Sequence, residues 1–225
     1  MPRLDAWLVD TGRYSSRQLA KRAIKEGIVI VNGKYCKPST CITGKEEIKI
    51  LSESFNKPMG YHKLRMIDEL LGGTLIQLPC LALDIGSSAG GFLQYLQHKG
   101  AQVIGIEVSK RFSQILNELA ATYSEISFIL TDAFTIEPTS ILTKGQIDLL
   151  LVDVTTDKGG TLNLISRFRV LLRKGSRLVA AFKIKNDPGI VLQVIKSVKS
   201  LGFDQITNFT LDDARQEVHI VAHFM

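Results

Sequence analysis

Two lysines and two carboxylates stand at positions in the sequence where acid–base chemistry could take place. Asp153 ends the apolar run IDLLLVD and Lys183 ends SRLVAAFK, while Lys63 lies in GYHKL and Glu217 begins the last apolar run. The carboxyl ends of parallel strands share one edge of a sheet, so we expect Asp153 and Lys183 to converge there, joined by Lys63 and Glu217. A partly desolvated lysine beside a second cation has a lowered pKa and can take a proton from a weak nucleophile such as a hydroxyl. Ordinary surface ion pairs are the alternative, mainly for Lys63 and Glu217.

A glycine-rich turn, DIGSSAGGF, covers residues 84–92 and follows the first apolar run of the same region. Gly86 would allow a sharp turn, and Gly90 and Gly91 would let the backbone approach a ligand or pack closely on the sheet. The spacing G-x-x-x-G-G differs from the G-x-G-x-x-G pattern of dinucleotide sites, which argues against NAD. Asp84, at the turn itself, suits a ligand that carries an ammonium group.

Two further acids end the next strands of this region. Glu107 follows Asp84 at about the 20-residue spacing at which an acid binds ribose hydroxyls, and Asp132 could accept a hydrogen bond from an adenine amino group. A helix cap or a solvated strand end is the alternative for Asp132. The acid, the glycine-rich turn and the second acid resemble the S-adenosylmethionine site of a Rossmann-like methyltransferase. The resemblance implies a cofactor site made by Asp84, Gly86, Ser87, Ser88, Gly90, Gly91, Phe92, Glu107 and Asp132.

Alternating strand-like and helix-like segments must position these residues. The strand-like runs are almost entirely apolar and cover 81–86, 102–108, 126–132, 147–153 and 176–183. Such alternation predicts an α/β fold with a mostly parallel sheet that helices cover on both faces. No helical pattern separates the last two runs, near 204–211 and 217–224, so we expect them to pair as an antiparallel hairpin.

The excess positive charge lies in the N-terminal quarter of the chain. Residues 1–58 hold 11 Lys+Arg against 6 Asp+Glu, whereas residues 59–225 hold 17 against 16. This distribution predicts a basic module that binds a polyanion, attached to a nearly neutral body. The alternative is a surface that only keeps the protein soluble.

A helix in this basic segment is expected between Ser15, which begins a capping-box pattern, and Gly27, which would end it. Within it Arg17, Lys21 and Lys25 are four residues apart and share one face. Like charges at this spacing repel one another, and a row of phosphates would relieve the repulsion. The residues expected to pack on a core are Leu19, Ala20, Ala23 and Ile24.

Short strands are expected after this helix. The run IVIVNGKY contains Asn32-Gly33, a strong hairpin signal, and further strands are expected at 37–42 and 48–51. The SR-x-x-A, G-x-V-x-VNG and P-S segments within residues 2–51 together resemble the S-four-type RNA-binding domain, a small α+β fold. The resemblance implies RNA contacts by Arg3, Arg13, Ser16, Arg17, Lys21, Arg22 and Lys25.

The chain from end to end resembles the TlyA family. It would comprise an S-four-type domain at 1–51, a polar linker at 52–58, and at 59–225 a Rossmann-like class I methyltransferase domain similar to the FtsJ-type ribose methyltransferases. Members of the family are cytoplasmic 2′-O-methyltransferases of ribosomal RNA cytidines, and many carry a haemolysin label. The resemblance implies S-adenosylmethionine as cofactor and ribosomal RNA or ribosomal subunits as partner. It also implies a catalytic tetrad of Lys63, Asp153, Lys183 and Glu217, with Lys183 as the base.

Composition argues against several other classes of protein. No apolar run approaches the roughly 18 residues of a membrane span, and charges interrupt the N-terminus at once, so we expect a cytoplasmic protein without a membrane partner. The three cysteines form no CxxC pair, and His219 and His223 are interpreted as structural, so no metal site is predicted. No obligate protein partner is inferred. The alternatives to an enzyme are a non-catalytic RNA-binding or ribosome-assembly protein and a membrane-lytic haemolysin.

Overall fold

A computed structural model describes residues 1–225 except 15, 26–27, 51–56 and 212–215. The chain divides into two compact units, Met1–Lys57 and Pro58–Met225. The predicted linker, 52–58, lies mostly outside the described residues. Within the described ranges, no helix has both the length and the apolar character needed to cross a bilayer.

The N-terminal unit contains two short helices and a small antiparallel sheet, as predicted. Its elements are α1 (Leu4–Asp10), α2 (Arg17–Lys25), β1 (Val29–Val31), β2 (Lys34–Tyr35) and β3 (Ile48–Ile50), with strand order β2-β1-β3. Asn32 and Gly33 have φ values of +48° and +74°, which are typical of the two-residue turn between β1 and β2. The hairpin prediction is therefore confirmed.

The strand predicted at 37–42 is wrong. The backbone N–H of Thr40 donates to the carbonyl of Lys37 at 2.9 Å, and the Thr40 hydroxyl accepts from the Lys37 N–H at 3.1 Å, so this segment turns. Pro38 explains the difference, because it fixes its own φ near the value a turn needs and cannot donate a ladder hydrogen bond. Cys41 forms an isolated bridge with Arg3, ahead of α1.

Helix α2 buries a narrower face than the sequence suggests. Ala20, Ala23 and Ile24 are buried as expected, but Leu19 is 40% exposed, so its assignment to the core is wrong. Ser15 and Gly27, the predicted ends of this helix, lie outside the described residues. Ser16 precedes the first helical residue, and its hydroxyl accepts a hydrogen bond from the Leu19 N–H at 3.3 Å, as an N-cap does.

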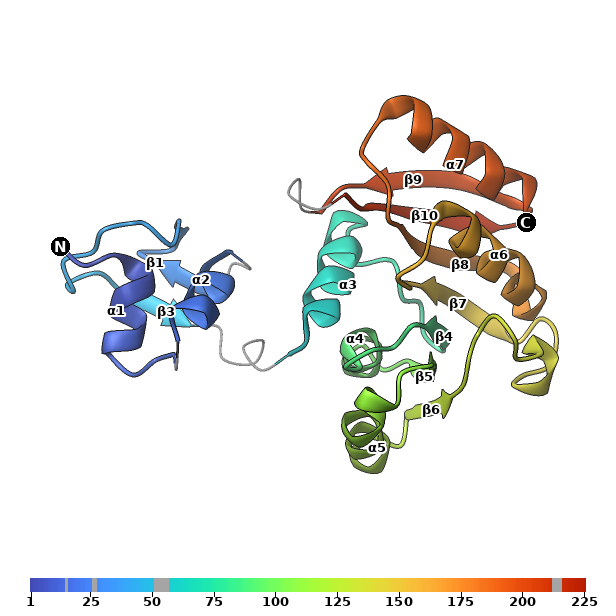
Figure 1. Cartoon of the computed structure of the whole chain (residues 1–225), viewed down its shortest axis with the longest axis horizontal. Coiled ribbons are helices and arrows are strands. Elements are labelled where there is room, and N and C mark those ends of the chain that lie inside the picture. The colour runs from blue at the N-terminus through green and yellow to red at the C-terminus, as the bar shows by residue number, and fades with distance from the viewer. Residues whose placement is uncertain (15, 26–27, 51–56, 212–215) are drawn as a thin grey trace. The chain divides into compact units, whose positions relative to one another are not determined.

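The C-terminal unit is an α/β domain built on a seven-stranded sheet of order β6-β5-β4-β7-β8-β10-β9 (Figure 1). The strands are β4 (Leu81–Ile85), β5 (Gln102–Glu107), β6 (Ile126–Leu130), β7 (Ile147–Val152), β8 (Leu172–Phe182), β9 (Phe203–Phe209) and β10 (Val218–Phe224). Strands β4 to β8 pair in parallel and β9 and β10 pair antiparallel, as predicted. β10 also pairs antiparallel with β8, which the sequence analysis did not predict. The strand order changes direction between β4 and β7, and ligands of open α/β sheets bind at the carboxyl edge of such a switch point.

Helices cover both faces of this sheet, with α3, α4 and α5 on one face and α6 and α7 on the other (Figure 1). The helices are α3 (Met59–Leu70), α4 (Gly91–His98), α5 (Ser113–Thr122), α6 (Lys158–Phe168) and α7 (Pro188–Ser200), with short 3-10 turns η2 (Lys110–Phe112), η3 (Pro138–Ser140) and η4 (Arg169–Leu171). Leu149 and Leu151 of β7 pack in the core under α3–α5, while Leu150 and Val152 pack in the core under α6 and α7. This burial on both faces explains the continuous apolar run of the strand.

Candidate active site

Lys63, Asp153, Lys183 and Glu217 form a closed ring of ion pairs. Lys63 Nζ lies 2.7 Å from Asp153 Oδ2 and 2.7 Å from Glu217 Oε1. Lys183 Nζ lies 2.6 Å from Asp153 Oδ1 and also donates to Glu217 Oε2. Each ammonium group thus bridges both carboxylates, and the ring carries no net charge. The four side chains are only 10–29% exposed, unlike the solvated surface pairs that were the alternative.

Three of these residues meet because their strands end at the same edge of the sheet. Asp153 directly follows β7 and Lys183 directly follows β8, the parallel neighbour of β7. Glu217 lies immediately before β10, which runs antiparallel to β8 with Val218 opposite Phe182. The start of β10 therefore lies beside the end of β8, and Glu217 reaches Lys183.

Lys63 lies on α3, a helix that the sequence analysis did not predict. Helix α3 approaches α4 so closely that a Cβ on Gly91 would lie 2.6 Å from the Tyr61 backbone nitrogen. At the other end of α3, the buried Asp68 accepts hydrogen bonds from the Tyr95 hydroxyl at 2.7 Å and the Leu75 N–H at 2.9 Å. These contacts fix α3 against α4, and so fix the position from which Lys63 reaches Asp153.

Burial and charge act in opposite directions on the groups of this ring. Burial favours the neutral form of Asp153, but the charges of Lys63 and Lys183 outweigh it and hold the pKa of Asp153 below its usual value. Burial also favours neutral Lys183, yet Asp153 and Glu217 raise the pKa of that lysine above its usual value. The expected lowering of a lysine pKa is therefore wrong for Lys183, because its two carboxylate neighbours favour the charged form.

His219 is a neighbour of the ring that the sequence analysis treated only as structural. Its Nε2 lies 2.8 Å from Glu217 Oε1, and its side chain is buried. Burial raises the pKa of Glu217, but the contacts with His219, Lys183 and Lys63 together bring it below the usual value. The signal was present in the sequence, because residues two apart on a strand share a face and the segment reads Glu-Val-His.

The glycine-rich turn lies against the same ring. Gly86 has a φ of +93°, and a Cβ at this position would lie 2.5 Å from the Asp153 carbonyl oxygen. Asp84, the residue before the last of β4, is fully buried beside this turn, and neither carboxylate oxygen has a hydrogen-bond partner among the described residues. Burial, together with the negative charges of Asp153 and Glu107, raises the pKa of Asp84 to about 7. A cation bound nearby would remove this unfavourable state.

The other predicted cofactor residues serve the turn and the core in this structure. Glu107 accepts backbone hydrogen bonds from Ser88 and Ser109, each at 2.7 Å, and so ties the turn to the end of β5. Asp132 accepts from the Phe134 N–H at 2.8 Å, which is an Asx turn in the loop after β6 and not a helix cap, because no helix begins there. The hydroxyl of Ser87 donates to the Asp84 carbonyl, and Phe92 packs in the core under α3–α5.

The sequence analysis missed two exposed apolar side chains, which follow Glu107 and Asp132 in the chain. Val108, directly after Glu107, is 65% exposed, and Phe134, two residues after Asp132, is 41% exposed. The signal was local, because Val108 follows the acid that ends β5, and Phe134 lies shortly after the acid that follows β6. Together they could flank a flat apolar ring at this edge of the sheet.

In the N-terminal unit, three of the predicted RNA contacts surround one buried carboxylate. Asp5 lies 3.0 Å from Arg3 Nε, 3.1 Å from Arg17 Nη2 and 3.8 Å from Lys21 Nζ. Asp5 together with these three cations is called the Asp5 cluster. Among the remaining predicted contacts, the Arg13 guanidinium lies over the Trp7 ring, 5.2 Å from its centroid, and Lys25 is exposed at the end of α2.

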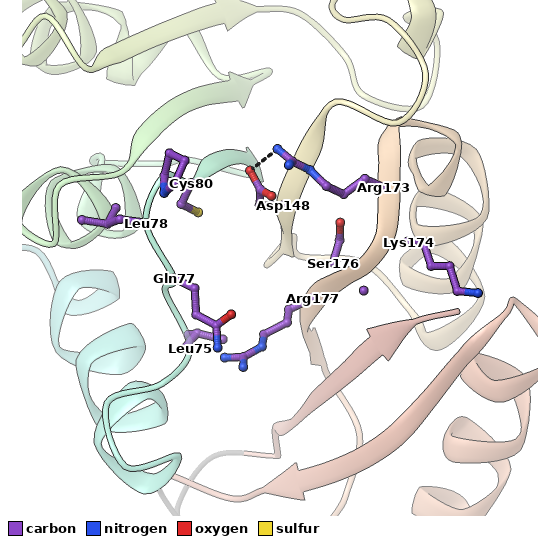
Figure 2. Close-up of a pocket in the computed structure, with 11 residues that line it drawn as sticks. Leu75, Gln77, Leu78, Cys80, Asp148, Arg173, Lys174, Ser176 and Arg177 are labelled. Carbon is purple, nitrogen blue, oxygen red and sulfur yellow. Dashed lines mark hydrogen bonds and ion pairs between the residues drawn. The ribbon is translucent and has the colours of Figure 1, made fainter.

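A pocket of about 280 Å³ lies at the opposite, amino-terminal edge of the large sheet, between the segments before β4 and at the start of β8. Figure 2 shows Arg173 directed at Asp148, 2.8 Å away, and Lys174 pointing out of the pocket. The Arg177 guanidinium donates to the Thr74 carbonyl. The pocket contains none of the residues predicted for catalysis or cofactor binding. In the part of the chain that the structure describes, no cluster of His, Cys, Asp and Glu could hold a metal ion.

Two models of known protein families match the chain. The model of the FtsJ-like methyltransferases matches residues 57–222, well over half of the chain. The chain belongs to the FtsJ-like methyltransferase family. A second model, that of the S4 domain, matches residues 2–48. The two matches account for the Rossmann-like domain and for the small basic unit before it.

Relatives and solved structures extend this assignment. The 16S/23S rRNA (cytidine-2′-O)-methyltransferase TlyA of Mycobacterium tuberculosis is 29% identical over 157 residues, 68% of this chain and 56% of the relative. The chain thus spans about half the length of the curated relatives it matches. A structure from Streptococcus thermophilus described as a candidate hemolysin is 21% identical with a TM-score of 0.58, covering 99% of this chain and 87% of that one. Fibrillarin of Aeropyrum pernix, solved with natively bound S-adenosyl-L-methionine, is 24% identical with a TM-score of 0.59, covering 80% of each chain. The structural likenesses show the fold.

Proposed function

We propose that this protein is an S-adenosylmethionine-dependent 2′-O-methyltransferase that acts on cytidine in ribosomal RNA. The observation that carries the proposal is the ring of Lys63, Asp153, Lys183 and Glu217 beside the glycine-rich turn. A ribose hydroxyl is a weak nucleophile, so its methylation needs a base held beside the methyl donor. The ring supplies an amine that two carboxylates hold in place.

The residues around the turn fit the proposed cofactor. S-adenosylmethionine, when bound, supplies a methyl group on a positively charged sulfonium. Asp84 is a buried carboxylate whose charge is uncompensated in the described structure, which suits a ligand carrying two cationic groups. Glu107 has lone pairs left after its two backbone hydrogen bonds, and the exposed Val108 and Phe134 could flank an adenine ring.

Lys183 is the residue we assign as the base. Its Nζ would accept the proton of the ribose 2′-hydroxyl, and Asp153 and Glu217 would hold the ammonium group that results. Because the two carboxylates raise the pKa of Lys183, its neutral form is a strong base but is rare near neutrality. The lysine must therefore lose a proton before each turnover, and Lys63 compensates the carboxylates while it does so.

The N-terminal unit is proposed to bring the RNA to this site. It carries most of the excess positive charge of the sequence, and the S4 domain model that matches it agrees with the RNA-binding domain that the sequence resembles. The TlyA relative is named for cytidine methylation of 16S and 23S rRNA, which supports ribosomal RNA as the substrate class. Phosphate contacts from such a unit would set affinity and orientation rather than the choice of nucleotide.

The test is to incubate the protein with methyl-labelled S-adenosylmethionine and either naked ribosomal RNA or purified ribosomal subunits. We expect label on a cytidine ribose, where the 2′-O-methyl group blocks alkaline cleavage of the following phosphodiester bond. Binding of S-adenosylmethionine is measured separately by calorimetry. Cofactor and RNA binding without label in any substrate would contradict the catalytic proposal and favour the non-catalytic RNA-binding alternative.

A further inference from the structure

Three cations of the N-terminal unit are held by a carboxylate that solvent does not reach. Asp5 has 0% side-chain exposure, whereas Arg3, Arg17 and Lys21 are 47%, 54% and 46% exposed. A phosphate that approaches this surface would meet the cations and not the carboxylate beneath them. The cluster holds three positive charges and one negative charge, so it keeps an excess of positive charge.

The contacts leave most donors of the cluster available. Arg17 uses Nη2 to reach Asp5 Oδ2, and Arg3 uses Nε and Nη2, the second at 3.4 Å. A guanidinium group has five N–H donors in a fixed plane, so each arginine keeps donors that can point outward. Fixing one edge of a guanidinium also removes much of the rotamer freedom that a phosphate would otherwise have to restrict.

The cluster also joins two helices. Arg3 and Asp5 lie at the start of α1, and Arg17 and Lys21 lie one turn apart on α2. Arg17 and Lys21 would repel each other on an isolated helix, and Asp5 offsets that repulsion in the folded unit. The carboxylate therefore acts both on the packing of α1 against α2 and on where the three cations point.

We infer that Asp5 is a positioning residue that holds Arg3, Arg17 and Lys21 in place as a binding site for a phosphate of the RNA backbone. The inference rests on the proposed binding of RNA. It makes a prediction opposite in sign to that from net charge, because removing a negative charge from a polyanion-binding surface should strengthen binding. If Asp5 positions the cations, removing its charge weakens binding.

The test compares two variants of the full chain that change the net charge equally. Asp5→Asn removes the buried carboxylate, and Asp10→Asn removes an exposed one at the end of the same helix. Affinity is measured by filter binding to protein-free 16S ribosomal RNA at two salt concentrations, with thermal unfolding followed for each variant. We expect Asp5→Asn to bind roughly 5–10-fold more weakly and Asp10→Asn to bind equally or up to about twofold more tightly.

The outcomes separate this inference from the proposed function. Equal or tighter binding by a folded Asp5→Asn variant would overturn the positioning role while leaving RNA binding intact, and Asp5 would then serve only the packing of α1 on α2. Absence of RNA binding by the wild type would contradict both. If Asp5→Asn melts below the assay temperature, Asp5→Glu replaces it, since it keeps the charge and displaces the carboxylate. Net charge then predicts unchanged affinity, and positioning predicts a several-fold loss.

Discussion

The Asp5 cluster and the ring around Asp153 use the same kinds of side chain in different proportions. Around Asp5, three cations meet one carboxylate and remain about half exposed. Around Asp153, two lysines meet two carboxylates and are 10–29% exposed. An exposed excess of positive charge suits the binding of a phosphate. A buried ring without net charge avoids an uncompensated ion and holds a titrating amine in one place, which suits proton transfer.

The comparison predicts its largest effect at Lys183. Lys183→Ala should lower the rate of methyl transfer by about 10³-fold, because the base is lost, and RNA affinity should stay within about twofold. Lys185→Ala is the matched control, since Lys185 is exposed two residues further along. Single-turnover methylation and RNA filter binding measure the two quantities. A rate for Lys183→Ala within tenfold of wild type would remove this lysine from the chemistry.

The same lysine predicts a pH dependence. Because the pKa of Lys183 is raised in the free protein, the neutral fraction should grow about tenfold with each pH unit below that pKa. The logarithm of kcat/KM should therefore rise with a slope of about one through the neutral and mildly alkaline range, without a plateau near pH 7. A flat profile between pH 7 and 9 would indicate that a different group accepts the proton.

Replacing Asp84 by Asn should weaken cofactor binding but stabilise the cofactor-free protein. Asp84→Asn should weaken S-adenosylmethionine binding roughly 10–100-fold, since the ligand loses a buried carboxylate. In the cofactor-free protein the native pKa of Asp84, about 7, exceeds the unfolded value of 3.8, so ionisation destabilises the fold increasingly between these values and fully above them. The variant should then be more stable than wild type at pH 8, on the order of 4 kcal/mol, and hardly different at pH 4.

Calorimetric titration and thermal melts at both pH values check this pair of effects. Asp204→Asn serves as the control, because Asp204 lies on β9, away from the glycine-rich turn. A loss of stability for Asp84→Asn at pH 8 would mean that the carboxylate has a partner in solution that the structure does not show.

His219 should have a smaller effect, and only through Glu217. His219→Leu removes the polar contact with Glu217 Oε1, whereas His219→Gln keeps a polar side chain of similar reach. We expect kcat to fall about tenfold in the leucine variant and about twofold in the glutamine variant, with KM for RNA unchanged in both. Equal losses in the two variants, tracking their melting temperatures, would reduce His219 to a core residue.

The positions at which the strands end were enough to predict that the residues of the ring lie close together. They were not enough to predict the pKa values of those residues. Asp153, Lys183 and Glu217 are found where parallel and antiparallel strands end at one edge, and this follows from the order of apolar runs. The position of Lys63 depends on α3 packing on α4 through Gly91 and on Asp68, contacts that join distant parts of the chain. The raised pKa of Lys183 depends on distances of a few ångströms, which no spacing in the sequence gives.

In the N-terminal unit too, local features could be predicted from the sequence and contacts between distant residues could not. The row of basic residues on α2 and the Asn32-Gly33 hairpin could be predicted from the sequence, because both depend on residues a few positions apart. The link from Asp5 to Arg17 spans a turn of the chain and was not predicted. The strand predicted at 37–42 is wrong for a local reason, because Pro38 favours a turn and cannot donate a ladder hydrogen bond.

The smallest expected effect is at Lys25, which lies on the same helical stripe as Arg17 and Lys21 but outside the Asp5 cluster. Lys25→Ala should remove one loosely held phosphate contact, so the slope of log K against log salt should fall by about 0.7–0.9 while affinity drops only about two- to threefold. Lys34→Ala, an exposed lysine on β2, is the control. Lys21→Ala should change the slope equally and affinity more, because Asp5 holds Lys21 in position. Equal affinities for Lys21→Ala and Lys25→Ala would show that the buried carboxylate gives its neighbours no advantage.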